Sequence, residues 1–252
     1  VHGNGLYGLK APSAPLNTGR SGTSLRLLLG ILCGQPFTTE VIRSEYEMKK
    51  PVGTIVNLLR QMGAEIKGRD NGNLCPLIVS PSTLTGTEIR LSEYETQMKS
   101  PLLLAGLYAR GETVVTEAVQ SRNHTELMLN YFGADIRTDG LKVTSRTVEN
   151  LYAQDIFIPG DLSLAAYFIA AALIVPNADI LIKNVGVNPT RAEVLDVFRR
   201  MGAKIELINR QTRNNEDVAD IHVVTSRLKG VRIDKNQAPA LIDELPVIAV
   251  AA

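Results

Sequence analysis

The five residues MGAEI at positions 62–66 return as FGADI at 132–136 and as MGAKI at 201–205. The glycines of these copies, Gly63, Gly133 and Gly202, lie 133 − 63 = 70 and 202 − 133 = 69 residues apart. Because glycine has no Cβ, it adopts the left-handed conformation that ends a helix. Each copy therefore predicts the end of one helix and the start of a strand, and the regular spacing predicts a repeated structural unit.

The residues before each glycine have the pattern of an amphipathic helix. Apolar side chains recur three and four positions apart, which leaves a polar face for solvent. These apolar positions are Ile55, Leu58, Leu59 and Met62 in the first copy, Leu127, Tyr131 and Phe132 in the second, and Val194, Leu195, Phe198 and Met201 in the third.

A second type of helix precedes each amphipathic one. It is rich in Leu, Ala and Gly with almost no charge, at residues 25–34, 101–109 and 164–175. Such a composition predicts a helix that is buried on all sides. A strand is predicted after each, at 37–42, 113–119 and 180–185, and a hairpin after the amphipathic helix, for example 221–225 with 230–233. The unit is buried helix, strand, amphipathic helix and hairpin, and it predicts a packed α/β architecture.

Composition limits the classes of partner. The chain has 252 residues, 44% of them apolar, and a net charge of +1, which is typical of one or two globular domains. The near-neutral balance gives no electrostatic reason to expect nucleic acid or an anionic membrane. The longest apolar run, 164–175, is too short to span a bilayer. Cys33 and Cys75 have no CxxC spacing, and we expect a reducing, cytoplasmic setting.

Several common enzyme classes are excluded by their missing motifs. His2, His124 and His222 have no metal-ligand spacing. The sequence also has no Walker loop, no GxGxxG and no nucleophile elbow. What remains are the starts of the buried helices, at 19–24, 95–100 and 159–163, which are rich in Ser, Thr, Asp and Gly. Each alone is best interpreted as a helix N-cap, but three of them in a repeated fold favour a shared anionic ligand.

These residues resemble one family. PLNTGRSGTSLR at 15–26 is similar to the PLNxGNSGTxxR segment of the 5-enolpyruvylshikimate-3-phosphate synthases. Further matches follow in the family's order: QMKSPLLLAGLY at 97–108, SRNHTE at 121–126, PGD at 159–161, NVGVNPTR at 184–191 and LIDELP at 241–246. The related UDP-N-acetylglucosamine enolpyruvyl transferases share the fold but not the SRNHTE or NPTR segments.

The resemblance implies an inside-out α/β barrel fold, built from pseudo-threefold repeats with helices inside and sheets outside. Residues 1–155 would form about two repeats of the shikimate-phosphate-binding domain. Residues 156–252 would form one repeat and the start of another from the second domain. Because the match covers only the middle of the family's length, we expect the remaining segments as partners and expect this stretch alone to be inactive. The three repeats could instead close on themselves into one pseudo-threefold unit.

The implied reaction moves the enolpyruvyl group of phosphoenolpyruvate to the 5-hydroxyl of shikimate 3-phosphate and releases phosphate. The family needs no metal or organic cofactor. By resemblance, Asp243 is the general base at the 5-hydroxyl, Gln97 and Ser121 bind shikimate 3-phosphate, Arg122 is the basic residue beside Ser121, and Gly22 contacts phosphoenolpyruvate through its backbone. Two alternatives stay open: Asp243 as the N-cap of a helix at 245–252, and 121–123 as an ordinary helix start.

Three positions depart from the family pattern. The Asn that follows Gly19 in the family is Arg20, and the GDxSLxxRPM segment reads RSEYEMKKPV at 43–52. The arginine that holds phosphoenolpyruvate is thus Lys50, which keeps the charge but loses the bidentate fork. The serine that binds the shikimate phosphate is Glu95, whose carboxylate would repel it.

Three classes of function follow from these matches and departures. The first is an enolpyruvyl transferase, which the matched motifs favour. The second is a non-catalytic relative that binds an anion or a protein, which Lys50 and Glu95 favour. The third is a repeat scaffold of the same fold.

Overall fold

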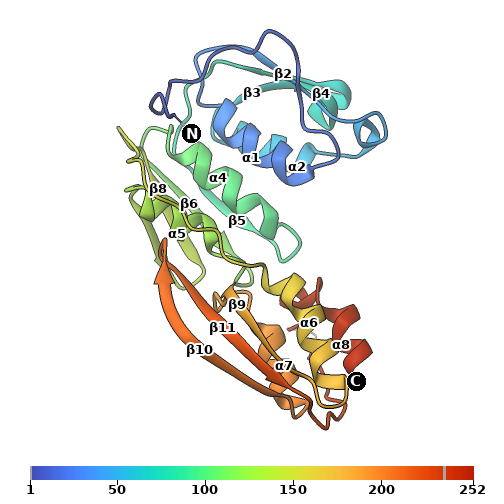
Figure 1. Ribbon diagram of the computed structural model, residues 1–252. Helices are drawn as coiled ribbons and strands as arrows, with labels where there is room; N and C mark the ends of the chain where they lie inside the picture. The colour runs from blue at the N-terminus through green and yellow to red at the C-terminus, as the bar shows by residue number, and fades with distance from the viewer. Residues whose placement is uncertain (1, 235–236) are drawn as a thin grey trace. The chain divides into compact units, whose positions relative to one another are not determined.

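Three copies of one helix-and-sheet arrangement follow one another along the chain, as Figure 1 shows. The structure is a computed structural model and describes residues 2–234 and 237–252. Contacts divide the chain into unit 1, Val1–Gln120 with Met128–Gln154, and unit 2, Ser121–Leu127 with Asp155–Ala252. Each unit has its own apolar core.

Unit 1 holds the first two copies. The first consists of β1 (Leu16–Asn17), α1 (Gly22–Leu32), β2 (Thr39–Ile42), the 3₁₀ turn η1 (Glu47–Lys49), α2 (Gly53–Gln61), β3 (Glu65–Gly68), α3 (Arg69–Gly72) and β4 (Leu74–Ser80). The second consists of β5 (Glu88–Leu91), η2 (Thr96–Met98), α4 (Lys99–Gly106), β6 (Glu112–Glu117), α5 (His124–Tyr131), β7 (Ile136–Asp139) and β8 (Lys142–Arg146). The division between the units falls within α5.

Unit 2 holds the third copy and two further helices. Its elements are α6 (Leu162–Ile174), β9 (Asp179–Gly186), α7 (Glu193–Arg200), β10 (Lys204–Arg213), β11 (Glu216–Val224), η3 (Ala238–Leu241) and α8 (Leu245–Ala251).

The three sheets share one topology, which confirms the repeat. The strand orders are β1-β2-β4-β3 and β5-β6-β8-β7 in unit 1, and β9-β11-β10 in unit 2. In unit 1 the first pair of each sheet is parallel and the others are antiparallel. In unit 2 a parallel bridge from Gly160 to Val185 stands where the first strand of the other sheets lies.

The repeated glycines end helices as predicted. Gly63, Gly133 and Gly202 have φ angles of 93°, 90° and 102°. In each copy the amide of the following alanine donates to the carbonyl five residues earlier, at 3.1 Å for Ala64, 2.9 Å for Ala134 and 3.0 Å for Ala203. This is the Schellman pattern, which requires a left-handed residue after the helix.

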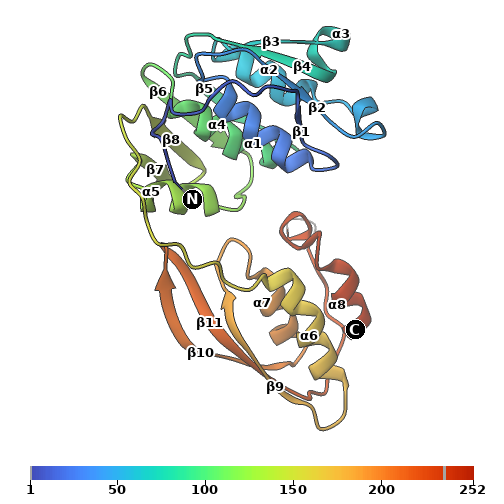
Figure 2. The same cartoon turned by 45° about the horizontal axis from the view of Figure 1, so that its top comes forward.

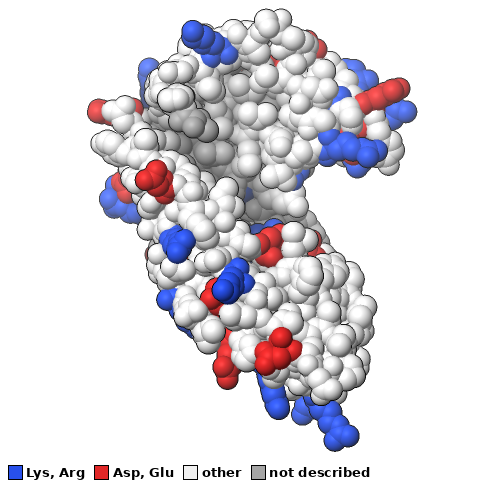
Figure 3. Space-filling model, viewed as in Figure 1, with Lys and Arg blue, Asp and Glu red and all other residues white. Residues whose placement is uncertain are grey.

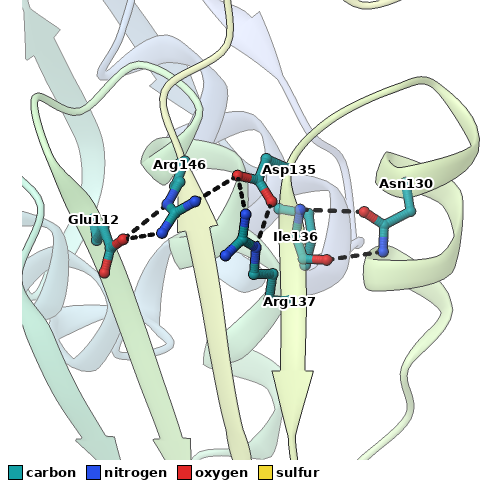
Figure 4. Close-up of polar contacts among 6 residues, drawn as sticks. All are labelled: Glu112, Asn130, Asp135, Ile136, Arg137 and Arg146. Carbon is teal, nitrogen blue, oxygen red and sulfur yellow. Dashed lines mark hydrogen bonds and ion pairs between the residues drawn. The ribbon is translucent and has the colours of Figure 1, made fainter.

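In the second copy, polar contacts join helix α5, which ends before Gly133, to strand β7, which follows it (Figure 4). Asn130 on α5 accepts from the backbone N–H of Ile136 at 3.1 Å and donates to its carbonyl at 3.0 Å. Arg146 on β8 bridges the carboxylates of Glu112 and Asp135. These contacts connect three strands and one helix around the end of the sheet.

Helices α1 and α4 of unit 1, which carry almost no charge, pack closely against each other, and Figure 2 shows them side by side. A Cβ on Gly30 of α1 would lie 2.3 Å from the carbonyl oxygen of Pro101 in α4. Only glycine allows this approach between the two backbones. The close approach explains why these helices are rich in small residues.

Two sequence predictions were wrong in detail. The hairpin of the third copy is β10 with β11, and residues 230–233 form no strand. Its turn is Asn214-Asn215, with φ of 51° and 64°, which suits a tight hairpin as Asn-Gly does. The helix at 164–175 is also not buried on all sides, because α6 leaves Leu164 and Phe168 each 65% exposed.

Candidate functional site

The start of helix α1 has a capped N-terminus without acidic side chains. Ser21 is its N-cap, and its hydroxyl accepts the backbone N–H of Ser24 at 3.0 Å. Gly22 is the first helical residue, and no acidic side chain lies in the first turn. Free N–H groups and the helix dipole make such a terminus favourable for an anion. The N-cap interpretation of residues 19–24 is therefore confirmed, and it leaves room for a ligand beside Gly22.

A cavity of about 200 Å³ lies at this terminus, inside unit 1. Its wall combines three cationic side chains with Gly22 and apolar residues from α2 and η2; the lining includes Gly22, Arg26, Arg43, Lys50, Val52 and Met98. Burial, and then the nearby cation of Arg43, lower the pKa of Arg26 below its usual range. An anion in the cavity would offset the repulsion between the two guanidinium groups.

Two of these cations share one carboxylate. Arg43 Nη2 lies 2.5 Å from Glu47 Oε2, and Lys50 Nζ lies 2.6 Å from Glu47 Oε1. The Arg43 and Glu47 side chains are only 6% and 8% exposed, whereas Lys50 is 52% exposed. The hydrogen bond from Lys50, with the charges of Lys50 and Arg43, lowers the pKa of Glu47, so the carboxylate is ionised at neutral pH.

The start of helix α4 differs from that of α1. Its N-cap is Met98, without a side-chain hydrogen bond, so the capping interpretation of residues 95–100 was wrong. Glu95 accepts instead from Ser92, at 2.9 Å from the amide and 2.7 Å from the hydroxyl. These hydrogen bonds lower the pKa of Glu95 and keep its carboxylate charged. Gln97 accepts from Arg26 Nη2, which connects the predicted ligand Gln97 to the cavity wall.

Asp243 in unit 2 forms an ion pair with Arg122. Arg122 Nη2 donates to Asp243 Oδ2 at 2.7 Å. The residue at the N-cap of α8 is Glu244, and it makes no capping hydrogen bond with its side chain. The N-cap alternative for Asp243 was therefore wrong, because Asp243 lies one residue too early and its carboxylate binds a guanidinium.

An amide network fixes the SRNHTE segment in unit 2. Asn188 Nδ2 donates to Asn123 Oδ1 at 2.7 Å and lies 3.1 Å from His124 Nδ1. Thr190 joins the same network, with its hydroxyl 2.8 Å from Asn188 Oδ1. Burial lowers the pKa of His124, which favours the neutral ring that accepts from Asn188. The SRNHTE and NPTR motifs therefore act as one structure that positions Ser121 and Arg122.

The start of helix α6 also carries an N-cap, as predicted. Asp161 accepts the N–H of Ser163 at 3.0 Å. Arg191 donates to Ser163 Oγ at 2.5 Å and to Asp161 at 3.2 Å, and Ser163 donates to Glu244. This cluster joins the PGD, NPTR and LIDELP segments within unit 2.

The structure brings some predicted site residues together. Gly22 and Lys50 line one cavity in unit 1, and Arg122 contacts Asp243 in unit 2. Gln97 lies beside the cavity through Arg26, and Ser121 belongs to unit 2, directly before Arg122 in the sequence. The sequence motifs did not single out Arg26 and Arg43, which line the cavity, or Glu47, which pairs with Arg43 and Lys50.

The described residues contain neither a metal-binding cluster nor a membrane-spanning helix. Between residues 2–234 and 237–252, no group of three His, Cys, Asp or Glu side chains could hold a metal ion. Within the same ranges, no helix combines the length and apolar character needed to cross a bilayer. On the face drawn in Figure 3, charges of both signs are scattered over a largely uncharged surface.

Comparisons with known proteins give one consistent result. The family model "EPSP synthase (3-phosphoshikimate 1-carboxyvinyltransferase)" matches residues 1–252. A 3-phosphoshikimate 1-carboxyvinyltransferase from Pelobacter propionicus is 48% identical over 252 residues, which are 100% of this chain and 58% of the relative. One from Bacillus subtilis is 45% identical over 252 residues, covering 100% of this chain and 59% of the relative.

A solved structure agrees with these sequences. EPSP synthase from Acinetobacter baumannii matches with a TM-score of 0.93 and 40% identity, over 100% of this chain and 57% of that one. The inside-out α/β fold expected from the resemblance is thereby confirmed. The chain spans less than two thirds of the length of the relatives and structures that it matches.

Proposed function

This chain belongs to the EPSP synthase family, and we propose from that premise that the protein containing it transfers an enolpyruvyl group. The donor would be phosphoenolpyruvate, the acceptor the 5-hydroxyl of shikimate 3-phosphate, and the second product phosphate. The observation that carries the proposal is the cavity at the start of α1, which Arg26, Arg43 and Lys50 line together with Gly22. Three cations at a helix N-terminus suit a small, strongly anionic ligand.

Phosphoenolpyruvate is assigned to this cavity. The backbone N–H of Gly22 and the ammonium of Lys50 would bind its charged groups. Lys50 would attract these groups through its charge alone, because an ammonium lacks the planar fork with which a guanidinium forms two parallel hydrogen bonds. A side chain at Gly22 would meet the cations of the wall, since its Cβ would lie 3.2 Å from Arg26 Nη1 and 3.7 Å from Arg43 Nη2.

Shikimate 3-phosphate is assigned to Gln97, Ser121 and Arg122. Arg122 would supply positive charge, and the amide of Gln97 would supply hydrogen bonds. The charged Glu95 works against this assignment, because it lies two residues from Gln97 and its pKa is lowered. We therefore expect the affinity for shikimate 3-phosphate to be weaker than an uncharged residue at position 95 would allow.

Asp243 is assigned as the general base. Its carboxylate is about half-exposed and forms an ion pair with Arg122. In the reaction it would take the proton of the 5-hydroxyl as the oxygen forms its bond to the enolpyruvyl carbon. No cofactor takes part in this proposal.

A cytoplasmic location belongs to the same proposal. Cys33 and Cys75 are both free and buried. Burial raises the pKa of Cys33 to about 12, so its thiol is unreactive. Buried free thiols of this kind suit a reducing compartment.

A non-catalytic relative that keeps the fold is the second proposal. It is supported by Glu47 and Glu95, which place two carboxylates beside the groups assigned to anions. In that case neither substrate would bind, and the cationic cavity would serve only to hold Glu47.

Calorimetric titration with shikimate 3-phosphate separates the two proposals. The first predicts measurable binding that weakens at least about tenfold in Gln97→Ala, because a hydrogen bond to a charged group is lost. Gln61→Ala is the matched control, since Gln61 is an exposed glutamine of α2 in the same unit. Absence of heat at millimolar ligand, with normal folding, would favour the non-catalytic relative.

A further inference from the structure

We propose that Arg43 is an anion-binding residue of the α1 cavity, where it supplies the guanidinium that position 50 lacks. The inference deepens the proposed function, on which it rests, because it names a further group that binds phosphoenolpyruvate. The family segment resembled by residues 43–52 has Gly at position 43, Leu at 47 and Arg at 50. Arg43 is thus a group that the resemblance does not supply.

The guanidinium of Arg43 lies in the wall of the cavity. Its Nη2 would be 3.7 Å from a Cβ at Gly22, so it faces the N-terminus of α1. Arg26 and Lys50 line the same cavity, and their charges meet there with that of Arg43. Arg43 therefore occupies a place where a donor can reach an anion held at Gly22.

The hydrogen-bonding capacity of Arg43 is only partly used. Its Nη1 donates to the Glu47 carbonyl at 3.2 Å and its Nη2 to the Glu47 carboxylate at 2.5 Å. Its Nε is buried and has no hydrogen-bond partner among the residues that the structure describes. A guanidinium has five N–H donors, so donors remain for a ligand. Nη2, which lies towards Gly22, carries a second hydrogen that a ligand in the cavity could accept.

Glu47 makes this arrangement possible. Three buried or half-buried cations around a small cavity would repel one another, and the carboxylate of Glu47 offsets one charge while touching both Arg43 and Lys50. The cavity keeps a net charge of +2 from Arg26, Arg43, Lys50 and Glu47. Glu47 also orients the guanidinium of Arg43, because it accepts from both of its Nη atoms.

The volume agrees with a small ligand. A water takes about 30 Å³ in the liquid, so a cavity of about 200 Å³ holds a few waters or one small phosphate ester. The cavity is lined by the apolar side chains of Val52 and Met98 as well as by the cationic ones. This combination favours a compact anion with a short carbon skeleton over a bare ion.

Calorimetric titration with phosphoenolpyruvate and, separately, with inorganic phosphate tests the inference. Arg43→Met/Glu47→Met removes both buried charges together, keeps the net charge of the cavity at +2 and leaves no lone buried ion. We expect this variant to bind phosphoenolpyruvate roughly tenfold to a hundredfold more weakly, because a charge-assisted donor is lost. Arg90→Gln is the control, because Arg90 is an 83% exposed member of an ion pair in the same unit.

A rescue variant distinguishes binding from a structural role. Arg43→Gly/Glu47→Leu/Lys50→Arg returns a guanidinium at position 50, and we expect it to regain most of the lost affinity. Inorganic phosphate should follow the same order with a smaller affinity if the phosphate group is the part that is bound.

Each remaining outcome overturns the inference in a recognisable way. Binding by Arg43→Met/Glu47→Met that equals the unaltered chain, together with loss in Lys50→Met, would assign Arg43 a purely structural role and leave the proposed function intact. Binding by the rescue variant alone would show that Arg43 supplies nothing. If neither the unaltered chain nor any folded variant bound phosphoenolpyruvate, both the inference and the assignment of phosphoenolpyruvate to this cavity would be overturned.

Discussion

Arg122 and Asp243, which are 121 positions apart in the sequence, meet in an ion pair of 2.7 Å. The side chains are 51% and 52% exposed. An exposed pair of this kind contributes only about 0–1 kcal/mol to stability. The pair therefore joins the SRNHTE and LIDELP motifs, contributes little to stability, and includes the carboxylate that we propose as the general base.

Replacing Asp243 separates catalysis from stability. In the protein containing this chain, the proposed role of Asp243 predicts that Asp243→Asn lowers the rate of enolpyruvyl transfer by about 10²–10⁴-fold, the usual contribution of a general base. The melting temperature should hardly change, because the pair is exposed. Asp234→Asn serves as control for a charge change in unit 2. A normal rate in Asp243→Asn would remove this residue from the proposed mechanism.

Removing the charge at position 95 should strengthen substrate binding. Glu95 is ionised because two hydrogen bonds from Ser92 lower its pKa. In Glu95→Ser the repulsion of a phosphate disappears, and we expect affinity for shikimate 3-phosphate to rise about tenfold in calorimetric titration. Glu93→Ser is the matched control, as an exposed glutamate in the same loop. Unchanged affinity in Glu95→Ser would mean that no phosphate binds near η2.

The buried ion pair of Lys99 with Glu117 joins α4 to β6. Lys99 Nζ lies 2.9 Å from Glu117 Oε2, and the side chains are 2% and 4% exposed. Lys99→Met should destabilise the chain by about 3–5 kcal/mol in urea unfolding, because the buried carboxylate loses this cation. Lys99→Met/Glu117→Met should recover most of that loss, since both charges are removed. A double variant no more stable than the single one would contradict this account.

Asp220 makes the stability of unit 2 depend on pH. Asn209 donates to one carboxylate oxygen and the backbone of Asn184 to the other, each at 2.8 Å, and these hydrogen bonds lower the pKa of Asp220. Both asparagines have positive φ and flank irregularities in the pairing of β10 and β9 with β11. The carboxylate thus connects three strands of the sheet.

The direction of the pH effect follows from the lowered pKa. The stabilisation is complete above the unfolded value of about 3.9 and is lost as pH falls through the lower folded value. Asp220→Asn should therefore melt below the unaltered chain at pH 7, and the gap should narrow towards pH 3. Asp217→Asn, on the same strand, is the control. A gap that stays constant with pH would show that the charge of Asp220 does not matter.

The repeat was predictable from its glycines because the left-handed backbone conformation at the end of each helix requires a residue without Cβ. Gly63, Gly133 and Gly202 must adopt positive φ, and that need is visible in sequence as a regular spacing. The hairpin was harder to locate. Asn214 and Asn215 form its turn, and the polar outer face of β10 hides the alternation that marks a strand. The exposed face of α6 was unpredictable for a different reason, since composition reports apolar character but not whether a partner covers it.

The site was predictable only where a motif names the residue. Gly22 and Asp243 were named from matched segments and Lys50 from its position in a segment that departs from the family, whereas Arg43 and Glu47 stand where the family pattern gives no ionisable residue. Their meeting depends on η1, which turns the chain so that Glu47 faces both Arg43 and Lys50. A short 3₁₀ turn leaves no periodic signal in sequence.

The central claim is that these 252 residues carry an enolpyruvyl transferase site. It is tested most directly in a hybrid in which they replace the matching residues of the Bacillus subtilis relative, which is 45% identical over this stretch. The hybrid is incubated with shikimate 3-phosphate and phosphoenolpyruvate, and ³¹P NMR follows the release of phosphate. The account predicts phosphate release that requires both substrates and is lost in Asp243→Asn. A folded hybrid that binds shikimate 3-phosphate but releases no phosphate would contradict it.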